Sequence, residues 1–308
     1  MRPLVSIIIP TYNNATVVRD AIDSALAQSY QRKEIIIVDD GSTDDTRKAL
    51  SSYTTRVNVI YQSNSGPGAA RNRAVAASRG ELLAFLDADD LWLPGKLEAQ
   101  VEFLSKHPDI GVAYHDWHVV DIDSPASAEF VRCAHQIQSN LSPPSSASDV
   151  RWLYNELLFE SVLCTDTVMM RRSLFDQLGK FDASLPQGQD YDLWLKASRR
   201  TQIGRLKEKF AVVRIRNRSI STTPRRENIR ALVLQRALAK WGRTGPDGRV
   251  TPKRAIRKVL GSIWMGFGYG HLTSGDSGIA KDAFLRAARL TPGNFRVWLN
   301  LMRALLRQ

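Results

Sequence analysis

Short apolar runs alternate with segments of helical spacing through the first third of the chain, and this alternation limits the fold to one class. The first run, residues 5–9, is rich in β-branched side chains and stops at Pro10, as is typical of a strand buried on both faces of a parallel sheet. The expected strands are residues 5–9, 34–38, 57–61, 81–86 and 111–114, and helices are expected to begin near residues 17, 44, 68 and 96. Strands joined by helices in this way predict an α/β fold, an open and mostly parallel sheet with helices on both faces.

The composition is that of a folded protein. Of 308 residues, 43% are hydrophobic and 24% are charged, which excludes a disordered chain, a collagen and a small disulfide scaffold. The length predicts one large domain with a smaller appendage, or two domains. The cysteines, Cys133 and Cys164, form no metal-binding pattern, so we expect both to be ordinary thiols.

Positive charge is concentrated in the last third of the chain. Residues 1–200 contain 20 Lys and Arg against 26 Asp and Glu, whereas residues 201–308 contain 23 against 5. This asymmetry predicts a basic region that faces an anionic partner, which could be a phospholipid surface, a phosphorylated substrate or nucleic acid. The region is helical in pattern beyond residue 228, and residues 279–306 resemble one tetratricopeptide-type hairpin, although simple helix packing explains them equally well.

The sequence contains no candidate membrane span. No run of about 18 apolar residues occurs, so no helix is expected to cross a bilayer. The opening apolar run at residues 4–9 is too short for the core of a signal peptide, and no small-residue cleavage site follows it. We therefore expect a cytoplasmic protein. Residues 121–149, rich in Ser, Pro and Ala, are expected to form a surface loop that is either a spacer or a lid over the active site.

Three aspartates follow the predicted strand at residues 81–86. They are Asp87, Asp89 and Asp90, at the strand end where open α/β sheets bind ligands. Crowded carboxylates repel one another, and a divalent cation among them relieves the repulsion. Mg²⁺ or Mn²⁺ held in this way would neutralise a departing diphosphate. An Asp-x-Asp motif also occurs in solvated turns and helix caps, so the motif alone leaves both interpretations open.

A second acidic pair, Asp39 and Asp40, follows the predicted strand at residues 34–38. A turn and a helix cap account for Gly41 and Ser42 but not for Asp40. A carboxylate at this edge of the sheet can accept a hydrogen bond from the imide N–H of uracil or thymine. Asp40 is therefore a candidate for selecting a pyrimidine nucleotide.

A glycine-rich turn precedes the predicted helix at about residues 68–79. Gly66 and Gly68 match the start of a dinucleotide-binding fingerprint, but Arg71 stands where the third glycine belongs, so the fingerprint fails. Arg71 offers a cation either to a phosphate or to the carboxylate cluster. The later glycines at residues 266–270 have no phosphate-loop context and are expected to allow close helix packing.

In combination these segments resemble family 2 glycosyltransferases. The resemblance rests on the order and spacing of Val5-Ser6-Ile7-Ile8-Ile9-Pro10-Thr11-Tyr12-Asn13, Val38-Asp39-Asp40-Gly41-Ser42-Thr43-Asp44, Asn64-Ser65-Gly66, Ala70-Arg71-Asn72, Phe85-Leu86-Asp87-Ala88-Asp89-Asp90, Arg171-Arg172, Gly179-Lys180-Phe181-Asp182 and Gln189-Asp190-Tyr191-Asp192-Leu193-Trp194. It covers about residues 4–220. It implies a GT-A fold, a nucleotide-diphosphate sugar donor, a divalent metal and inversion at the anomeric carbon.

The resemblance also implies roles for single residues. The nucleotide-sugar site would comprise Pro10, Thr11, Tyr12, Asp40, Arg71 and Asp87, with Asp40 on the pyrimidine. Asp89, together with Asp87, would bind Mn²⁺ or Mg²⁺. Asp190 matches the catalytic base, which takes the proton from the acceptor hydroxyl.

Departures from the family pattern affect the expected base, the mode of transfer and the metal site. Gln189 replaces the acidic residue that usually precedes the base, so Asp190 lacks a neighbouring charge. No Gln-x-x-Arg-Trp motif follows, which favours transfer of a single sugar over processive synthesis. Arginines fill residues 213–219, where the family often has a metal-binding histidine, so Arg214 or Arg218 is expected to reach a phosphate instead.

The leading hypothesis is an inverting, metal-dependent transferase that moves one sugar from a UDP- or dTDP-sugar to an acceptor hydroxyl in the assembly of a cell-surface glycan. The expected domains are a catalytic domain at residues 1–220, with a nucleotide-sugar half at about 1–110 and an acceptor half at about 111–220, and a basic helical region at 221–308. The acceptor would be a glycan, a lipid-linked saccharide or a protein, and residues 201–308 would contact an anionic membrane surface at its inner face. One alternative is a non-catalytic protein that binds nucleotide sugars. Another is a nucleic-acid-binding protein that uses the basic region, although no recognition motif supports it and no nucleic acid is expected.

Overall fold

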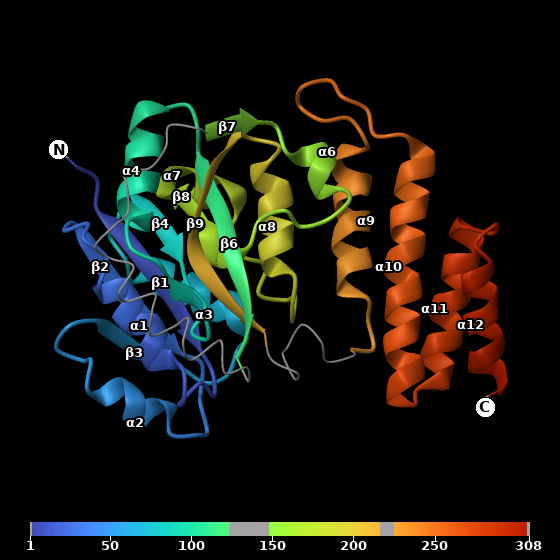
Figure 1. Ribbon diagram of the computed structural model, residues 1–308, viewed down its shortest axis with the longest axis horizontal. Coiled ribbons are helices and arrows are strands. Elements are labelled where there is room, and N and C mark those ends of the chain that lie inside the picture. The colour runs from blue at the N-terminus through green and yellow to red at the C-terminus, as the bar shows by residue number, and fades with distance from the viewer. Residues whose placement is uncertain (1, 123–147, 216–224, 307–308) are drawn as a thin grey trace. The chain divides into compact units, whose positions relative to one another are not determined.

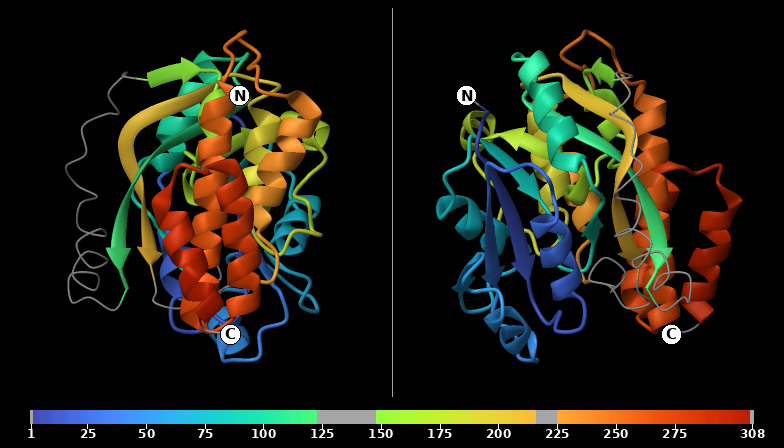
Figure 2. Two further views of the ribbon diagram at one scale, coloured as in Figure 1. Left: turned by 90° about the vertical axis from the view of Figure 1, so that its right-hand side faces the viewer. Right: turned by 60° about the vertical axis from the view of Figure 1, so that its left-hand side comes forward.

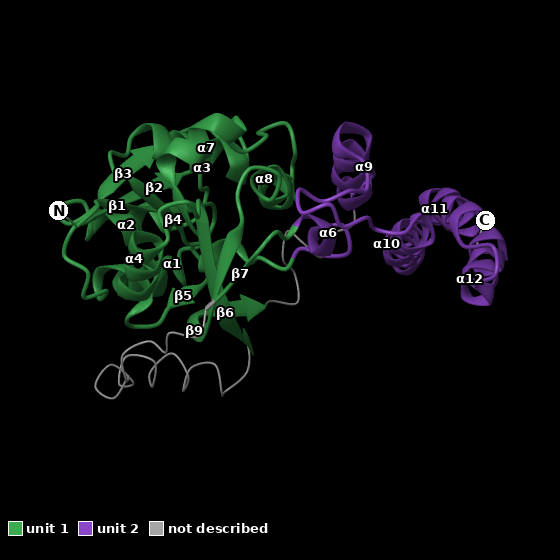
Figure 3. Cartoon of the chain, turned by 90° about the horizontal axis from the view of Figure 1, so that it is seen from above, with its two compact units in different colours: residues 1–153, 162–217 green, residues 154–161, 218–308 purple. Residues whose placement is uncertain are grey.

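The computed structural model describes residues 2–122, 148–215 and 225–306. Contacts divide the chain into two compact units, which Figure 3 shows in different colours. Unit 1 comprises Met1–Leu153 and Val162–Asn217, and unit 2 comprises Tyr154–Ser161 and Arg218–Gln308. The expected boundary at residue 220, Cys133, Arg218 and nearly all of the expected loop at 121–149 lie outside the described residues.

Unit 1 is built on one nine-stranded sheet of mixed direction (Figure 1). Its strands are β1 Val5–Thr11, β2 Lys33–Asp39, β3 Asn58–Tyr61, β4 Leu82–Phe85, β5 Leu91–Trp92, β6 Val112–Asp121, β7 Ser148–Arg151, β8 Met169–Arg171 and β9 Ile203–Ile215. The order is β3-β2-β1-β4-β8-β6-β9-β5, with β7 paired to β9. The strands from β3 to β4 are parallel, β8 is antiparallel to both of its neighbours, and β6 is again parallel to β9. The mostly parallel α/β sheet is confirmed.

Helices cover both faces of this sheet (Figure 3). They are α1 Val18–Leu26, α2 Thr46–Ser51, α3 Pro67–Ala76, α4 Lys96–Lys106, α7 Arg172–Leu178 and α8 Gln189–Ala197, with the short 3-10 helix η2 Thr165–Thr167. Because alternate residues of a strand point to opposite faces, Ile7 and Ile9 pack in the core that includes α1 and α4. On the other face Phe85 contacts Phe175 of α7 and Trp194 of α8. Every residue of β1 is buried, on both faces of the sheet, which explains its continuous apolar run.

Unit 2 is helical. It contains α6 Tyr154–Leu157, α9 Ile229–Trp241, α10 Lys253–Ser274, α11 Ser277–Leu290 and α12 Phe295–Leu306. Its core joins the last three helices through Leu272, Ala280, Phe284, Ala287, Ala288, Val297, Leu301 and Ala304. A Cβ on Gly268 would lie 2.9 Å from the ring of Phe284, so the close packing expected at residues 266–270 is confirmed for Gly268, whereas a Cβ on Gly266 or Gly270 would meet nothing within 4 Å. The helical hairpin expected at residues 279–306 corresponds to α11 and α12, at the red end of the chain in Figure 2.

The helix α6 belongs to unit 2 although it lies between two segments of unit 1 in the sequence. The buried Tyr154 donates its hydroxyl hydrogen to the carbonyl of Gly242, 2.7 Å away. The side-chain amide of Asn155 donates to Thr251 Oγ1 at 2.7 Å. Throughout the described residues, no helix combines the length and apolar composition that a bilayer span requires.

Candidate active site

The carboxyl ends of β1, β2 and β4 lie at one edge of the sheet, where the sequence placed the site. The amide of Asp40 donates to the carbonyl of Thr11 at 2.8 Å, which ties the loops after β1 and β2 together. Pro10 and Thr11 are buried at the end of strand β1, while Tyr12 is 41% exposed. The hydroxyl of Thr11 has no hydrogen-bond partner among the described residues. This edge therefore presents one exposed aromatic ring and one buried, unsatisfied hydroxyl.

Asp40 is buried and organises the loop that precedes α3. Its Oδ1 accepts hydrogen bonds from the amide of Ser65 at 2.8 Å and from the side chain of Gln62 at 2.6 Å. Its Oδ2 accepts one from the amide of Gly66, also at 2.8 Å. A carboxylate oxygen can accept two hydrogen bonds, so Oδ2 keeps capacity for one further donor.

Arg71 projects from α3 to the acidic loop after β4. Its Nη2 forms an ion pair with Asp87 Oδ1, and its guanidinium lies 5.6 Å from the centre of the Phe181 ring. Burial opposes the charge, but the carboxylates of Asp87 and Asp190 prevail and raise the pKa of Arg71. Its Nε and Nη1 are buried without a hydrogen-bond partner among the described residues. Arg71 thus carries two donors that a ligand anion could satisfy.

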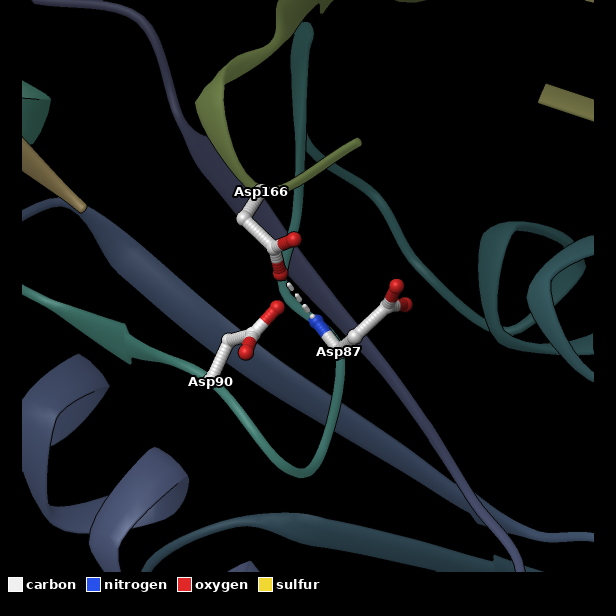
Figure 4. Close-up of side chains that lie close together, drawn as sticks. All are labelled: Asp87, Asp90 and Asp166. Carbon is white, nitrogen blue, oxygen red and sulfur yellow. Dashed lines mark hydrogen bonds between the residues drawn. The ribbon is translucent and has the colours of Figure 1, made fainter. Parts of the chain in front are cut away.

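Three carboxylates meet beside Arg71: Asp87, Asp90 and Asp166 (Figure 4). One oxygen from each lies within 4.8 Å of the others. Asp166 comes from η2, and its Oδ1 accepts a hydrogen bond from the amide of Asp87 at 2.6 Å. In Figure 4 the carboxylates of Asp90 and Asp166 face one another, while that of Asp87 turns aside. Burial and the charge of Asp87 raise the pKa of Asp166 to about 6, and burial and the charge of Asp166 raise the pKa of Asp90 well above its usual range.

This donor set fits a hard divalent cation. Oxygen ligands from carboxylates are those that Mg²⁺ and Mn²⁺ prefer, and a cation would relieve the repulsion that raises the two pKa values. The cluster contains Asp87, one of the two predicted ligands, Asp90, which belongs to the predicted acidic loop, and Asp166, which no sequence pattern predicted. It does not include Asp89, which is half-buried in the same loop.

Arg214 links the acidic loop to α1. Its side chain is 3% exposed and lies in β9, where Nη1 pairs with Asp20 Oδ2 at 2.7 Å. Its Nε donates to the carbonyl of Asp89, and its backbone amide donates to Asp90 Oδ1 at 2.7 Å. The guanidinium of Arg214 thus holds the acidic loop, and Arg218 lies outside the described residues, so the expectation that one of the two reaches a phosphate stays a prediction.

Asp190 lies in the first turn of α8 and is half-buried. Its Oδ2 accepts a hydrogen bond from the hydroxyl of Thr165 at 3.1 Å, and its Oδ1 accepts one from the amide of Tyr191 at 2.8 Å. Thr165 directly precedes Asp166, so one short helix contacts both Asp190 and the acidic loop. Neighbouring Gln189 is buried, and its side-chain oxygen has no partner among the described residues.

Sequence reasoning overlooked Thr165 and Asp166. They lie in the short polar segment Cys164-Thr165-Asp166-Thr167, whose composition is that of an ordinary loop and which follows no predicted strand. Their position depends on β8, which pairs with β4 through three residues. A pairing this distant in sequence leaves no local pattern.

Comparison with known families identifies the chain. The sequence model of glycosyl transferase family 2 matches residues 6–179, more than half of the chain. The chain belongs to glycosyl transferase family 2. The matched span contains the acidic loop, Arg71 and η2 of this family 2 member, and it ends before Asp190.

Several relatives in the curated set are similar in sequence to this family 2 chain. TuaG of Bacillus subtilis (strain 168), whose name places it in teichuronic acid biosynthesis, is 33% identical over 228 residues, 72% of this chain and 82% of its own length. An uncharacterized glycosyltransferase of Rickettsia typhi is 37% identical over 201 residues, 63% of this chain and 58% of its own length. The chain spans between 28% and 60% of the length of the five Rickettsia relatives that it matches.

Solved structures share the fold. TarS of S. aureus, residues 1–349 in complex with UDP-GlcNAc, superposes with a TM-score of 0.63 at 18% identity, covering 99% of this chain and 88% of that structure. The mannosyltransferase PcManGT from Pyrobaculum calidifontis, in complex with GDP-Man and Mn²⁺, gives a TM-score of 0.54 at 20% identity and covers 100% of this chain and 87% of its own. At these identities the likeness establishes the fold, and the GT-A prediction is confirmed.

Proposed function

We propose that the protein is an inverting, metal-dependent glycosyltransferase that moves a single sugar from a UDP- or dTDP-sugar to an acceptor hydroxyl. One observation carries the proposal. Thr165 bonds the carboxylate of Asp190, and the next residue, Asp166, bonds the backbone of Asp87. A base and an acidic cluster anchored on adjacent residues would be held in the fixed relation that an in-line displacement needs.

In the proposed reaction Asp190 takes the proton of the acceptor hydroxyl. The acceptor oxygen forms a bond to the anomeric carbon, while the bond from that carbon to the diphosphate oxygen breaks with its electron pair. Attack from the side opposite the leaving group inverts the configuration. One carboxylate on the acceptor side is sufficient for this chemistry. The reaction therefore does not require an acidic residue at position 189, where this chain has Gln189.

Asp87 and Asp89 remain the proposed ligands of Mn²⁺ or Mg²⁺, and the observed cluster adds Asp90 and Asp166 to the candidates. When bound, the cation would supply positive charge to the departing diphosphate. The unsatisfied donors of Arg71 would bind phosphate oxygens at the same place. This account is supported by the burial of the cluster, which makes its negative charge costly without a cation.

The proposed nucleotide site comprises Pro10, Thr11, Tyr12 and Asp40. Tyr12 would stack on the base, and the remaining capacity of Asp40 Oδ2 would accept the imide N–H of a pyrimidine. The UDP-GlcNAc complex of TarS and the GDP-Man complex of PcManGT support a nucleotide-sugar donor without fixing the base.

The proposed acceptor is an intermediate of a cell-surface glycan, modified at the inner face of the membrane. The names of two relatives support this assignment: TuaG refers to teichuronic acid, and WfgD of Escherichia coli, 31% identical over 194 residues, to a sugar on diphosphoundecaprenol.

Calorimetric titration of the full chain tests the donor half of the proposal. UDP, dTDP, GDP and CDP are titrated in the presence of Mn²⁺ and again with EDTA. Binding of UDP or dTDP that requires the metal is the expected result. Nucleotide binding that EDTA leaves unchanged would refute metal dependence, and absence of binding under both conditions would refute the nucleotide site.

Hydrolysis and transfer distinguish the enzyme from a non-catalytic binder of nucleotide sugars. A catalytic site releases UDP or dTDP from the bound donor slowly in water and faster with an acceptor. A protein that binds the donor tightly and releases no nucleoside diphosphate with any glycan acceptor would favour the non-catalytic alternative.

A further inference from the structure

The helix α12 carries two apolar faces, and only one of them is packed. Val297, Leu301 and Ala304 are buried in the core of unit 2 against α10 and α11. Six other apolar side chains are between 43% and 82% exposed: Phe295, Trp298, Leu299, Met302, Leu305 and Leu306. They recur at steps of three and four residues, so they share one side of the helix, which we call the outer stripe.

The outer stripe is a continuous surface. Scattered exposed apolar residues are ordinary, but a contiguous row of six along three turns of helix marks a site of interaction. Trp298 is fixed within it, because its indole N–H donates to the carbonyl of Pro292 at 2.8 Å. The tryptophan ring is therefore held at the surface.

The surroundings of the outer stripe are basic. The polar side of α12 carries Arg296 and Arg303, and residues 283–308 include five Arg and no Asp or Glu. Arg257 of α10 reaches the same end of the hairpin, where its Nη2 donates to the carbonyl of Arg289 at 3.1 Å. The beginning of α12, with Phe295 and Trp298, thus lies beside a group of arginines.

The charges decide which partner fits. A second copy of this chain would bring arginines against arginines, because residues 283–308 supply no acidic partner. An anionic phospholipid surface instead offers acyl chains to the apolar side chains and phosphates to the arginines. Aromatic rings beside basic residues are characteristic of helices that lie in the plane of such an interface.

We propose that α12 docks on an anionic phospholipid bilayer, with the outer stripe among the upper acyl chains and Arg296 and Arg303 at the headgroups. Binding of this kind is peripheral and reversible. It does not depend on the proposed sugar transfer, so each can fail without the other.

Sedimentation of the full chain with lipid vesicles tests this proposal. Vesicles of phosphatidylcholine alone are compared with vesicles containing equal parts of phosphatidylcholine and phosphatidylglycerol. We expect binding to the anionic vesicles that weakens with added salt. The double variant Leu299→Ser/Met302→Ser should bind the anionic vesicles at least about tenfold more weakly, since each serine removes an exposed apolar side chain from the docking face. Arg296→Gln/Arg303→Gln should bind about tenfold more weakly to the anionic vesicles only.

Val250→Ser is the matched control. Val250 is 57% exposed in unit 2 and lies outside α12, so this variant should bind vesicles like the unchanged protein. Thermal unfolding of all variants checks that the surface substitutions leave the fold intact. Equal binding of the unchanged protein and the Leu299/Met302 variant would overturn the proposal. So would sedimentation velocity data in which that variant turns a dimer into a monomer while vesicle binding persists, because the stripe would then join two copies of the chain.

Discussion

Asp190 and Asp192 stand two positions apart on α8 but have different surroundings. Asp190 is bonded by Thr165 from η2, whereas Asp192 forms an ion pair with Lys196 of its own helix at 2.6 Å. The first contact fixes a carboxylate from outside the helix, and the second is a local pair. The two residues therefore form a matched test of the proposed base.

Asp190→Asn should lower the transfer rate by a factor of about 10² or more, since an amide cannot take the acceptor proton. Binding of the nucleotide and Mn²⁺ should remain, because the substitution lies outside the acidic cluster. The rate is measured with saturating donor and the binding by calorimetry. Asp192→Asn should keep nearly full activity, and equal rates in both variants would remove Asp190 from the mechanism.

Thr165→Val should lower kcat about tenfold while leaving the KM for the donor nearly unchanged, because the valine no longer holds the carboxylate of Asp190. Thr165→Ser retains the hydroxyl and should restore most of the rate. The neighbouring hydroxyl of Thr167 donates to the carbonyl of Cys164 at 2.7 Å, so Thr167→Val controls for the loss of a buried hydrogen bond. A similar fall in kcat for Thr167→Val would show that the effect is one of stability.

At the scale of elements, α4 begins with a buried lysine. Lys96 is fully buried, donates to Gln100 Oε1 at 2.7 Å and lies 4.0 Å from the centre of the Trp92 ring. Burial lowers its pKa from 10.5 to about 7. The unfolded chain therefore holds a proton between about pH 7 and pH 10.5 that the folded chain has released.

This difference predicts that the free energy of unfolding rises with pH above about 7, by at most about 1.4 kcal/mol per pH unit from this one group. Lys96→Met should flatten the rise, since methionine has no proton to exchange. Denaturant unfolding at several pH values between about 6 and 10 measures the slope. Lys106, at the exposed end of the same helix, serves as the control, and an equal slope for Lys96→Met and Lys106→Met would contradict the prediction.

The sequence predicted the elements with local patterns. The runs expected at 5–9, 34–38, 57–61, 81–86 and 111–114 are β1, β2, β3, β4 and β6. The strand β9 was overlooked because its first half carries Lys207 and Lys209, and its place in the sheet comes from pairing with β6. The acidic loop is likewise far in sequence from Thr165 and Asp166, since Asp87 and Asp166 are 79 residues apart. Strand ends could be predicted from apolar runs, whereas the side chains that other strands bring to them could not.

At the scale of the whole molecule, the two units are interleaved in the sequence. Residues 154–161 belong to unit 2, although the segments before and after them belong to unit 1. The segment that follows them contains η2. In the folded chain the side chains of Tyr154, Leu157 and Leu158 are fully buried, and the ring of Tyr154 contacts Trp241 of α9. The chain 1–217 would thus keep this segment without the helices that cover it.

We expect the truncated chain 1–217 to be poorly soluble, because removal of α9 to α12 exposes these apolar side chains. The triple substitution Tyr154→Ser/Leu157→Ser/Leu158→Ser in the truncated chain should raise the soluble yield. The yields of both chains are compared after expression under the same conditions. A truncated chain that is as soluble as the full chain without the substitutions would show that the segment can fold back on unit 1.

The interleaving also restricts how such a chain can be recombined. A chimera that joins residues 1–217 of this protein to the helices of a relative at one junction would combine a foreign helical unit with the native α6. Tyr154 and Asn155, which bond the carbonyl of Gly242 and the hydroxyl of Thr251, would then meet unmatched partners. A graft that carries residues 154–161 along with the helices needs three junctions, after residues 153, 161 and 217, and preserves these bonds. Insertions, deletions and exchanges in this chain are therefore coupled at two places that lie more than fifty residues apart.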